Sequence, residues 1–164
     1  MPHVRTPVLL VPATMADIDR LSPRLIAGIE HGFADRDAGV GMLRDVMAQF
    51  ATISRPARWG SFWSVDTAGE RMVGLSGFKA PPANGAVEIG YLTFPRYEGH
   101  GYATRTIAAL VAHAWREVAL VVAHTLPLPN ASNAVLARHG FSHVGEVLDP
   151  EDGLVWRWEK SRRA

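Results

Sequence analysis

The hydrophobic pattern of the chain changes its period at a pair of glycines near position 100. Residues 87–94 have the composition of a strand that ends at Pro95. Apolar residues then recur every three to four positions from 103 to 114, which predicts a helix. Gly99 and Gly101 lie between the two, where they let the backbone approach a neighbouring group closely. The chain must therefore place a strand, a tight loop and a helix N-terminus side by side.

The rest of the sequence alternates between short strand patterns and helical patterns. A turn at 81–85 separates two strands, and Pro23 can break the first helical run. Asn130 or Ser132 can cap a short helix that Gly140 stops. The pattern predicts one mixed α/β domain over 1–164, with its core at about 8–159. We expect strands at 8–11, 59–65, 72–78, 87–94, 120–123, 141–147 and 154–159, helical stretches from 15 and over 40–50, a loop at 35–41 and a hairpin turn at 67–70.

Composition excludes several classes of function. The 164 residues contain no cysteine, which excludes disulfides, thiolate metal sites and a cysteine nucleophile. A net charge of +1 gives no basic face for nucleic acid. There is no long apolar span or signal-like N-terminus, so we expect a cytoplasmic protein without a membrane partner. His139 and His143 have metal-like spacing but no further ligands nearby, and no metal site is predicted.

The glycine loop is a candidate anion site. The first N–H groups of a helix have no intrahelical partner, and with the helix dipole they favour a phosphate. A tight turn without a ligand is the alternative. The loop lacks the Gly-Lys-Ser/Thr of a Walker motif. It also lacks the third glycine and the acidic residue about 20 positions on that a dinucleotide fold requires.

The flanking sequence resembles a known family. The stretch EIGYLTFPRYEGHGYAT resembles the acyl-CoA-binding motif of the GNAT superfamily of N-acetyltransferases, and HTLPLPNASNAVLARHGF resembles its second motif. The amino-acid sequences of both stretches are similar to those of the branch that contains the ribosomal-protein N-terminal acetyltransferases. Element order agrees from Val8 to Glu159. The resemblance implies a twisted, mostly antiparallel sheet with helices on both faces, splayed at the acetyl-CoA site.

The resemblance also implies which residues hold acetyl-CoA. Backbone groups of the strand after Tyr91 would bond the pantetheine arm in the gap between residues 91–94 and 120–123, with an asparagine on the far side. Glu98 stands where the family has Arg or Gln, so its carboxylate should turn to solvent, and His100 or Arg105 could restore positive charge. The implied cofactor-binding residues are Leu92, Thr93, Phe94, Glu98, Gly99, His100, Gly101, Tyr102, Ala103, Thr104, Asn130 and Asn133.

Two residues are candidates for proton transfer. Attack on a thioester requires a neutral amine. A carboxylate whose pKa is raised toward neutral pH by burial can deprotonate the amine. The resemblance places Glu88 where several family members carry a catalytic glutamate. The alternative is a partly exposed strand residue paired with a lysine or arginine, and a water-relayed base, or none beyond water, also fits. The family's thiol-protonating tyrosine corresponds to Leu136, which leaves Ser132 as the next donor, or else as a helix cap.

We interpret the chain as an acetyl-CoA-dependent N-acetyltransferase that works by direct transfer in a ternary complex and releases CoA. The acceptor is a primary amine, either a peptide N-terminus or a small molecule. By fold analogy alone, Phe33, Trp63 and Tyr91 line the acceptor site, while His124 could face it or be packed. The alternatives are a non-catalytic acyl-CoA-binding module and an ATP-binding protein. Oligomeric state stays open, with a homodimer among the options.

Overall fold

The strands form one open mixed sheet. The computed structural model describes residues 6–51, 54–68 and 70–163. Within these ranges, seven strands lie in the order β1-β2-β3-β4-β5-β7-β6, and every neighbouring pair is antiparallel except β4 and β5. The strands are β1 (Val8–Pro12), β2 (Ser61–Asp66), β3 (Arg71–Phe78), β4 (Ala86–Thr93), β5 (Leu120–Thr125), β6 (Ser142–Asp149) and β7 (Gly153–Ser161).

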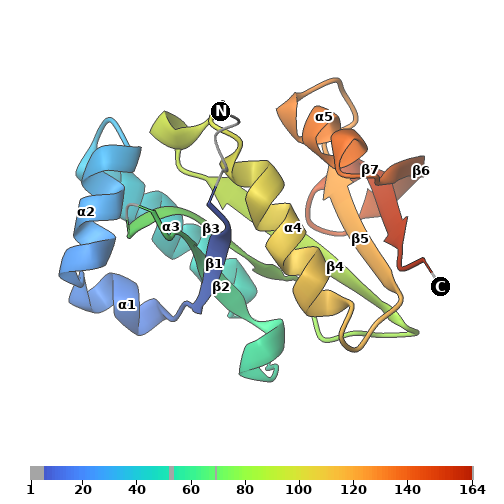
Figure 1. Cartoon of the computed structure of the whole chain (residues 1–164), viewed down its shortest axis with the longest axis horizontal. Helices are drawn as coiled ribbons and strands as arrows, with labels where there is room; N and C mark the ends of the chain where they lie inside the picture. The colour runs from blue at the N-terminus through green and yellow to red at the C-terminus, as the bar shows by residue number, and fades with distance from the viewer. Residues whose placement is uncertain (1–5, 52–53, 69, 164) are drawn as a thin grey trace.

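Helices cover both faces of this sheet. Figure 1 shows α4 in front of the sheet and α3 behind it, with α1 and α2 grouped beside α3, and α5 near the N-terminal end of α4. The predicted mixed α/β class, with helices on both faces, is confirmed. The helices are α1 (Met15–Arg20), α2 (Pro23–Gly32), α3 (Arg36–Phe50), α4 (Tyr102–Ala114) and α5 (Ala131–Arg138), with short 3-10 turns at Ala57–Trp59 and Pro95–Tyr97. No helix in the described ranges is long and apolar enough to cross a membrane.

Alternation along the strands produces a separate core on each face. On β2, Phe62 packs with the α4 residues Ile107 and Leu110, whereas its neighbour Trp63 packs with Ile29 of α2 and residues of α3. All five side chains are nearly inaccessible to solvent. Successive strand residues point to opposite faces, so one strand contributes to both cores. Burial of each large apolar side chain stabilises the fold by about 1.5–3 kcal/mol.

Local sequence signals set most element boundaries correctly. Asn84 and Gly85 both have positive φ, 51° and 74°, as a tight hairpin turn requires. Pro23 begins α2 behind Ser22, whose hydroxyl accepts from the Leu25 amide, so the predicted break is confirmed. Trp59, predicted to begin a strand, instead ends a 3-10 turn before β2. The predicted turn at 67–70 includes residue 69, which lies outside the described residues.

The prediction of a loop at 35–41 is wrong, because α3 begins at residue 36. Asp35 is its N-cap, and its carboxylate accepts a hydrogen bond of 2.7 Å from the Ala38 amide. Gly39 and Gly41 lower helix propensity and concealed the helix in the sequence. Gly39 is nevertheless needed, since a Cβ there would lie 2.8 Å from the Phe33 ring. Close packing of α3 against the end of α2 outweighs the propensity of its first turn.

Strands β4 and β5 pair over only their first four residues. Their parallel register runs from Ala86 opposite Leu120 to Ile89 opposite Ala123. Beyond that point β4 continues to Thr93 along β3, and β5 continues to Thr125 along β7. The two strands therefore separate at their C-terminal ends. The separation lies between residues 90–93 and 124–125, just beyond the paired stretch of β5 that the sequence resemblance placed at the gap.

The N-cap of α3 gives a direct test of this part of the fold. We expect Asp35→Ala to lower the free energy of unfolding by about 1 kcal/mol, because the Ala38 amide loses its acceptor. Urea unfolding would measure the change. The matched control is Asp37→Ala in the same first turn, for which we expect a loss of only about 0.3 kcal/mol from the helix dipole. Equal losses in the two variants would contradict the capping role.

Candidate active site

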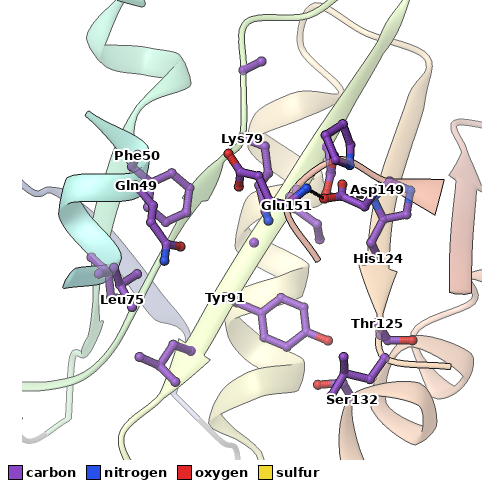
Figure 2. Close-up of a pocket in the computed structure, with 18 of the residues that line it drawn as sticks. Gln49, Phe50, Leu75, Lys79, Tyr91, His124, Thr125, Ser132, Asp149 and Glu151 are labelled. Atoms are coloured by element: carbon purple, nitrogen blue, oxygen red, sulfur yellow. Dashed lines mark hydrogen bonds and ion pairs between the residues drawn. The ribbon is translucent and has the colours of Figure 1, made fainter. Parts of the chain in front are cut away.

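A cavity of about 620 Å³ opens where β4 and β5 separate. Its walls come from α3, β4, β5, the start of α5 and the turn between β6 and β7. Figure 2 shows Gln49 and Phe50 on one side, Tyr91 across the middle, and His124 and Ser132 on the other side. The lining residues are Val46, Gln49, Phe50, Leu75, Lys79, Ala80, Glu88, Ile89, Gly90, Tyr91, Leu92, His124, Thr125, Leu126, Asn130, Ser132, Asp149, Pro150 and Glu151.

Glu88 and His124 form an ion pair or hydrogen bond across the two strands. The Nδ1 atom of His124 lies 3.0 Å from Oε1 of Glu88. The side chain of His124 is 14% exposed and that of Glu88 is 26% exposed, and both line the cavity. Val122 is the residue opposite Glu88 in the parallel register, so His124 follows it on the same face. Glu88 therefore has a histidine partner at the cavity, where the sequence analysis considered a lysine or arginine on the surface.

Tyr91 reaches across the gap toward α5. Its ring points from β4 toward Ser132 (Figure 2), and its Oη is buried with no hydrogen-bond partner among the described residues. Burial raises the pKa of Tyr91, while the nearby Ser132 hydroxyl has a smaller, lowering influence. An unpaired buried hydroxyl is unfavourable in a folded protein. This one lies beside a second hydroxyl at the edge of a cavity, where a ligand can satisfy it.

The backbone of β4 presents only alternate residues to the gap. The Phe94 amide donates to the Val73 carbonyl, and the Glu88 carbonyl accepts from the Lys79 amide. Because an antiparallel pair uses alternate residues, Leu92 also directs its backbone groups to β3. Tyr91 and Thr93 direct theirs to the side where β5 has separated. Of the three strand residues predicted to bond the pantetheine arm, only Thr93 has this orientation; Leu92 and the Phe94 amide do not.

In the loop before α4, the carbonyls of Glu98, His100 and Gly101 accept hydrogen bonds, whereas the amides have no acceptor among the described residues. Arg105 donates from Nε to the Gly101 carbonyl at 3.2 Å and from a terminal nitrogen to the His100 carbonyl at 3.4 Å. The His100 ring donates to the Glu98 carbonyl at 2.8 Å. None of the amides from residue 99 to 104 donates to an acceptor in the described ranges. Gly99 and Gly101 have φ of 76° and 78°, a conformation that favours glycine.

A second network holds this loop against β1 and β2. The Tyr102 hydroxyl donates to Asp66 at 2.7 Å, and Arg105 stacks on the Tyr102 ring and donates to the Thr6 carbonyl at 2.8 Å. Burial would raise the pKa of Asp66, but hydrogen bonds from Tyr102, the Ala68 amide and Thr6 outweigh it and lower that pKa. Tyr102 and Arg105 thus position the loop with their side chains. Glu98 is exposed, as predicted.

The polar residues at the start of α5 have different roles. Asn130 is the N-cap, and its Oδ1 accepts from the Asn133 amide at 2.9 Å, which leaves Ser132 free of capping. Asn130 lines the cavity, and its Nδ2 has no partner among the described residues. Asn133 is buried and donates to the Leu128 carbonyl at 2.7 Å, so it holds the turn before α5. Leu136 is fully buried in the core.

Two of the three predicted acceptor residues lie elsewhere. Phe33 is 7% exposed and packs on Phe94, and Trp63 is 1% exposed and donates from Nε1 to Asp17. Both belong to the core under α2 and α3, and neither lines the cavity. Tyr91 does line it. Phe33 lies at the C-terminal end of α2 and Trp63 lies on β2. Sequence patterns do not reveal which face of a strand, or which side of a helix end, borders a cavity when helices cover both faces of the sheet.

Several lining residues were missed or given too little weight. His124 was considered only as a possible cavity residue, and it meets Glu88 there. Gln49 and Phe50 come from the end of α3, the helix whose start the sequence hid. Asp149 and Glu151 come from the β6–β7 turn, where the Asp149 carboxylate accepts from the amides of Glu151 and Asp152. An Asp-Pro-Glu-Asp-Gly stretch predicts a turn, but not that the turn meets β4 and β5.

Solved structures of acetyltransferases share this fold. RimL, a ribosomal-protein alpha-N-acetyltransferase in complex with coenzyme A, has a TM-score of 0.67 and 20% identity, with 95% of this chain and 94% of that chain covered. RimJ from Mycobacterium smegmatis, in complex with a CoA disulfide, has a TM-score of 0.65 and 19% identity, with 94% of this chain and 85% of that chain covered. A GNAT-family acetyltransferase from Bacillus anthracis has a TM-score of 0.63 and 16% identity, with 96% of each chain covered.

The sequence itself also identifies a family. No curated protein matches it significantly. Residues 8–142, however, match the acetyltransferase (GNAT) domain family, from the first strand to the start of β6. That range contains the separated strands, the glycine loop and α5. The chain therefore belongs to the GNAT acetyltransferase family and is an acyltransferase.

Proposed function

We propose that this protein transfers an acetyl group from acetyl-CoA to a primary amine bound in the cavity, by direct attack in a ternary complex. The observation that carries the proposal is the separation of β4 from β5, which leaves Glu88, Tyr91 and Ser132 around one opening. Proton-transferring groups thus surround the place where a thioester would lie between the strands. A covalent cysteinyl intermediate is excluded, because the chain has no cysteine.

The residues present suit an acyl-CoA. Six consecutive amides at the start of α4 have no acceptor in the described ranges, and a helix N-terminus favours a diphosphate. The backbone groups of Tyr91 and Thr93 face the gap and would bond the amide groups of a pantetheine arm as a neighbouring strand would. Nδ2 of Asn130 is available on the opposite side. When bound, acetyl-CoA would supply the acetyl thioester.

We propose that Glu88, in contact with His124, assists removal of a proton from the amine. An α-amino group has a pKa of about 7.7–8.0 and a lysine side chain about 10.4, so a peptide N-terminus is the easier acceptor to deprotonate at neutral pH. The similarity to RimL, an alpha-N-protein acetyltransferase, also favours an N-terminus. The mixed lining, with Phe50 and Leu126 beside Glu88 and Asp149, suits a chain end with one apolar and one polar part.

Tyr91 and Ser132 are the proposed donors to the departing sulfur. The family's tyrosine position is Leu136, which is buried in the core and cannot reach the gap. The Tyr91 hydroxyl enters the gap from the opposite strand, beside the Ser132 hydroxyl. Because burial raises the pKa of Tyr91, the phenol stays protonated at neutral pH and can donate. We therefore assign the role of the missing side chain to these two hydroxyls.

The function is tested by an acetyl-transfer assay on peptides with varied N-termini and a panel of small amines, with Glu88→Gln alongside the wild type. We expect transfer to peptides, and at least about tenfold slower turnover in the variant, with unchanged CoA affinity. Glu30→Gln, a surface carboxylate of α2, is the control and should keep full activity. Calorimetric CoA binding without transfer to any amine would refute the proposed activity.

The anion site is tested with a matched pair of glycines. Gly99 and Gly85 have φ of 76° and 74°, and a Cβ at either would meet no atom within 4 Å. Each alanine variant should therefore lose a similar stability, about 1–2 kcal/mol. We expect only Gly99→Ala to weaken CoA binding, by at least about tenfold, because its methyl group would stand beside the diphosphate. Equal CoA affinities by calorimetry would place the diphosphate elsewhere.

The phenol is tested with a matched pair of tyrosines. Tyr91 and Tyr97 each have a buried hydroxyl without a partner in the described ranges. Since neither variant loses a hydrogen bond, Tyr91→Phe and Tyr97→Phe should keep their stability or gain up to about 1 kcal/mol. We expect kcat to fall by about tenfold to a hundredfold in Tyr91→Phe alone. An unchanged kcat in Tyr91→Phe would assign the donor role to Ser132 without the phenol.

A further inference from the structure

The contact between Glu88 and His124 joins the two strands at the point of their separation. The last paired residues are Ile89 and Ala123, and His124 is the next residue of β5. Its Nδ1 lies 3.0 Å from the Glu88 carboxylate, in a position to donate. An imidazole whose Nδ1 carries the proton has a lone pair on Nε2. The pair therefore fixes the tautomer in which Nε2 can accept a proton.

Nε2 of His124 has no role in the free protein. It is buried and has no hydrogen-bond partner among the described residues, although His124 lines the cavity. The other charged or titratable side chains that line this cavity are Lys79 after β3, Tyr91 of β4, and Asp149 and Glu151 of the β6–β7 turn. None of them hydrogen-bonds to the ring. Nε2 is thus an unpaired basic nitrogen just behind the cavity wall, and a ligand seated against the ring can supply its missing partner.

We propose that His124 Nε2 receives the proton of the acceptor amine, and that Glu88 is its positioning residue. This inference rests on the proposed function. As the amine nitrogen forms its bond to the carbonyl carbon, its proton passes to Nε2, and the carbon–sulfur bond breaks with its electron pair on sulfur. The sulfur then takes a proton from the hydroxyl pair of Tyr91 and Ser132. The imidazolium returns the balancing proton through solvent to that pair.

At the usual pKa values of the two side-chain types, an imidazole is a better proton acceptor for an α-amino group than a carboxylate is. Transfer from an α-ammonium group to an ordinary glutamate is unfavourable by about three and a half orders of magnitude, from the difference between the two groups' usual pKa values. Transfer to an ordinary imidazole is unfavourable by only about one and a half orders. A carboxylate behind the imidazole stabilises the cation that forms. Glu88 has this position, and its side chain need not reach the amine itself.

The alternative is a structural pair that only fixes β5 beside β4. Asparagine distinguishes the two roles, because its side-chain amide can donate from nearly the position of Nδ1 and has nothing at Nε2. We expect His124→Asn to keep its melting temperature and CoA affinity and to lose about a hundredfold or more in kcat/KM. Glu88→Gln, which retains the imidazole, should lose less. His143→Asn, on β6 and outside the cavity, is the control.

A rescue measurement separates the outcomes. Imidazole added to His124→Ala should restore part of the rate. Full activity in His124→Asn, or a larger loss in Glu88→Gln than in His124→Asn, would overturn the histidine role while the transferase activity stands. Absence of transfer by the wild type would instead refute the proposed function.

Discussion

Backbone hydrogen bonding explains why the site lies where it does. A strand in the middle of a sheet must satisfy its N–H and C=O groups on both edges. Beyond Ile89, β4 keeps β3 on one edge, and no strand among the described residues pairs with its other edge. The groups of Tyr91 and Thr93 are left for a ligand that can imitate a strand. Seven strands bonded along their full length would have no such opening, and Tyr91 would have no gap to cross.

The loop before α4 uses the same constraint in a different way. Its carbonyls are bound by side chains of the protein, mainly Arg105 and His100. Two basic side chains therefore act indirectly: they hold the carbonyls, while the amides have no acceptor among the described residues. This resolves the departure at Glu98, whose side chain is exposed and whose carbonyl, not its carboxylate, takes part in the network. A cationic side chain at that position is not needed to form the loop.

Local signals in the sequence were sufficient for elements that depend on neighbours along the chain. Asn84-Gly85, Ser22-Pro23 and Gly140 mark their turn or helix ends by backbone conformation alone. The start of α3 was missed because its glycines lower helix propensity, and the reason for Gly39 is a contact with Phe33 in three dimensions. Local signals therefore made the fold class and the glycine loop predictable. They did not show that Phe33 and Trp63 lie in the core under α2 and α3, because that placement depends on contacts between distant segments.

The candidate site shows the same division more sharply. Glu88 was selected from the strand it occupies and from a family resemblance, and both are properties of one segment. The partnership of Glu88 with His124 depends on the parallel register of β4 and β5, which places a residue two positions beyond Val122 beside the carboxylate. No local sequence signal reveals that register, because the two strands are joined through α4 and are not adjacent along the chain. A histidine that closes a buried strand looks like a packed residue until its neighbour strand is known. Chemistry that is shared between two strands is therefore visible only once the sheet is assembled.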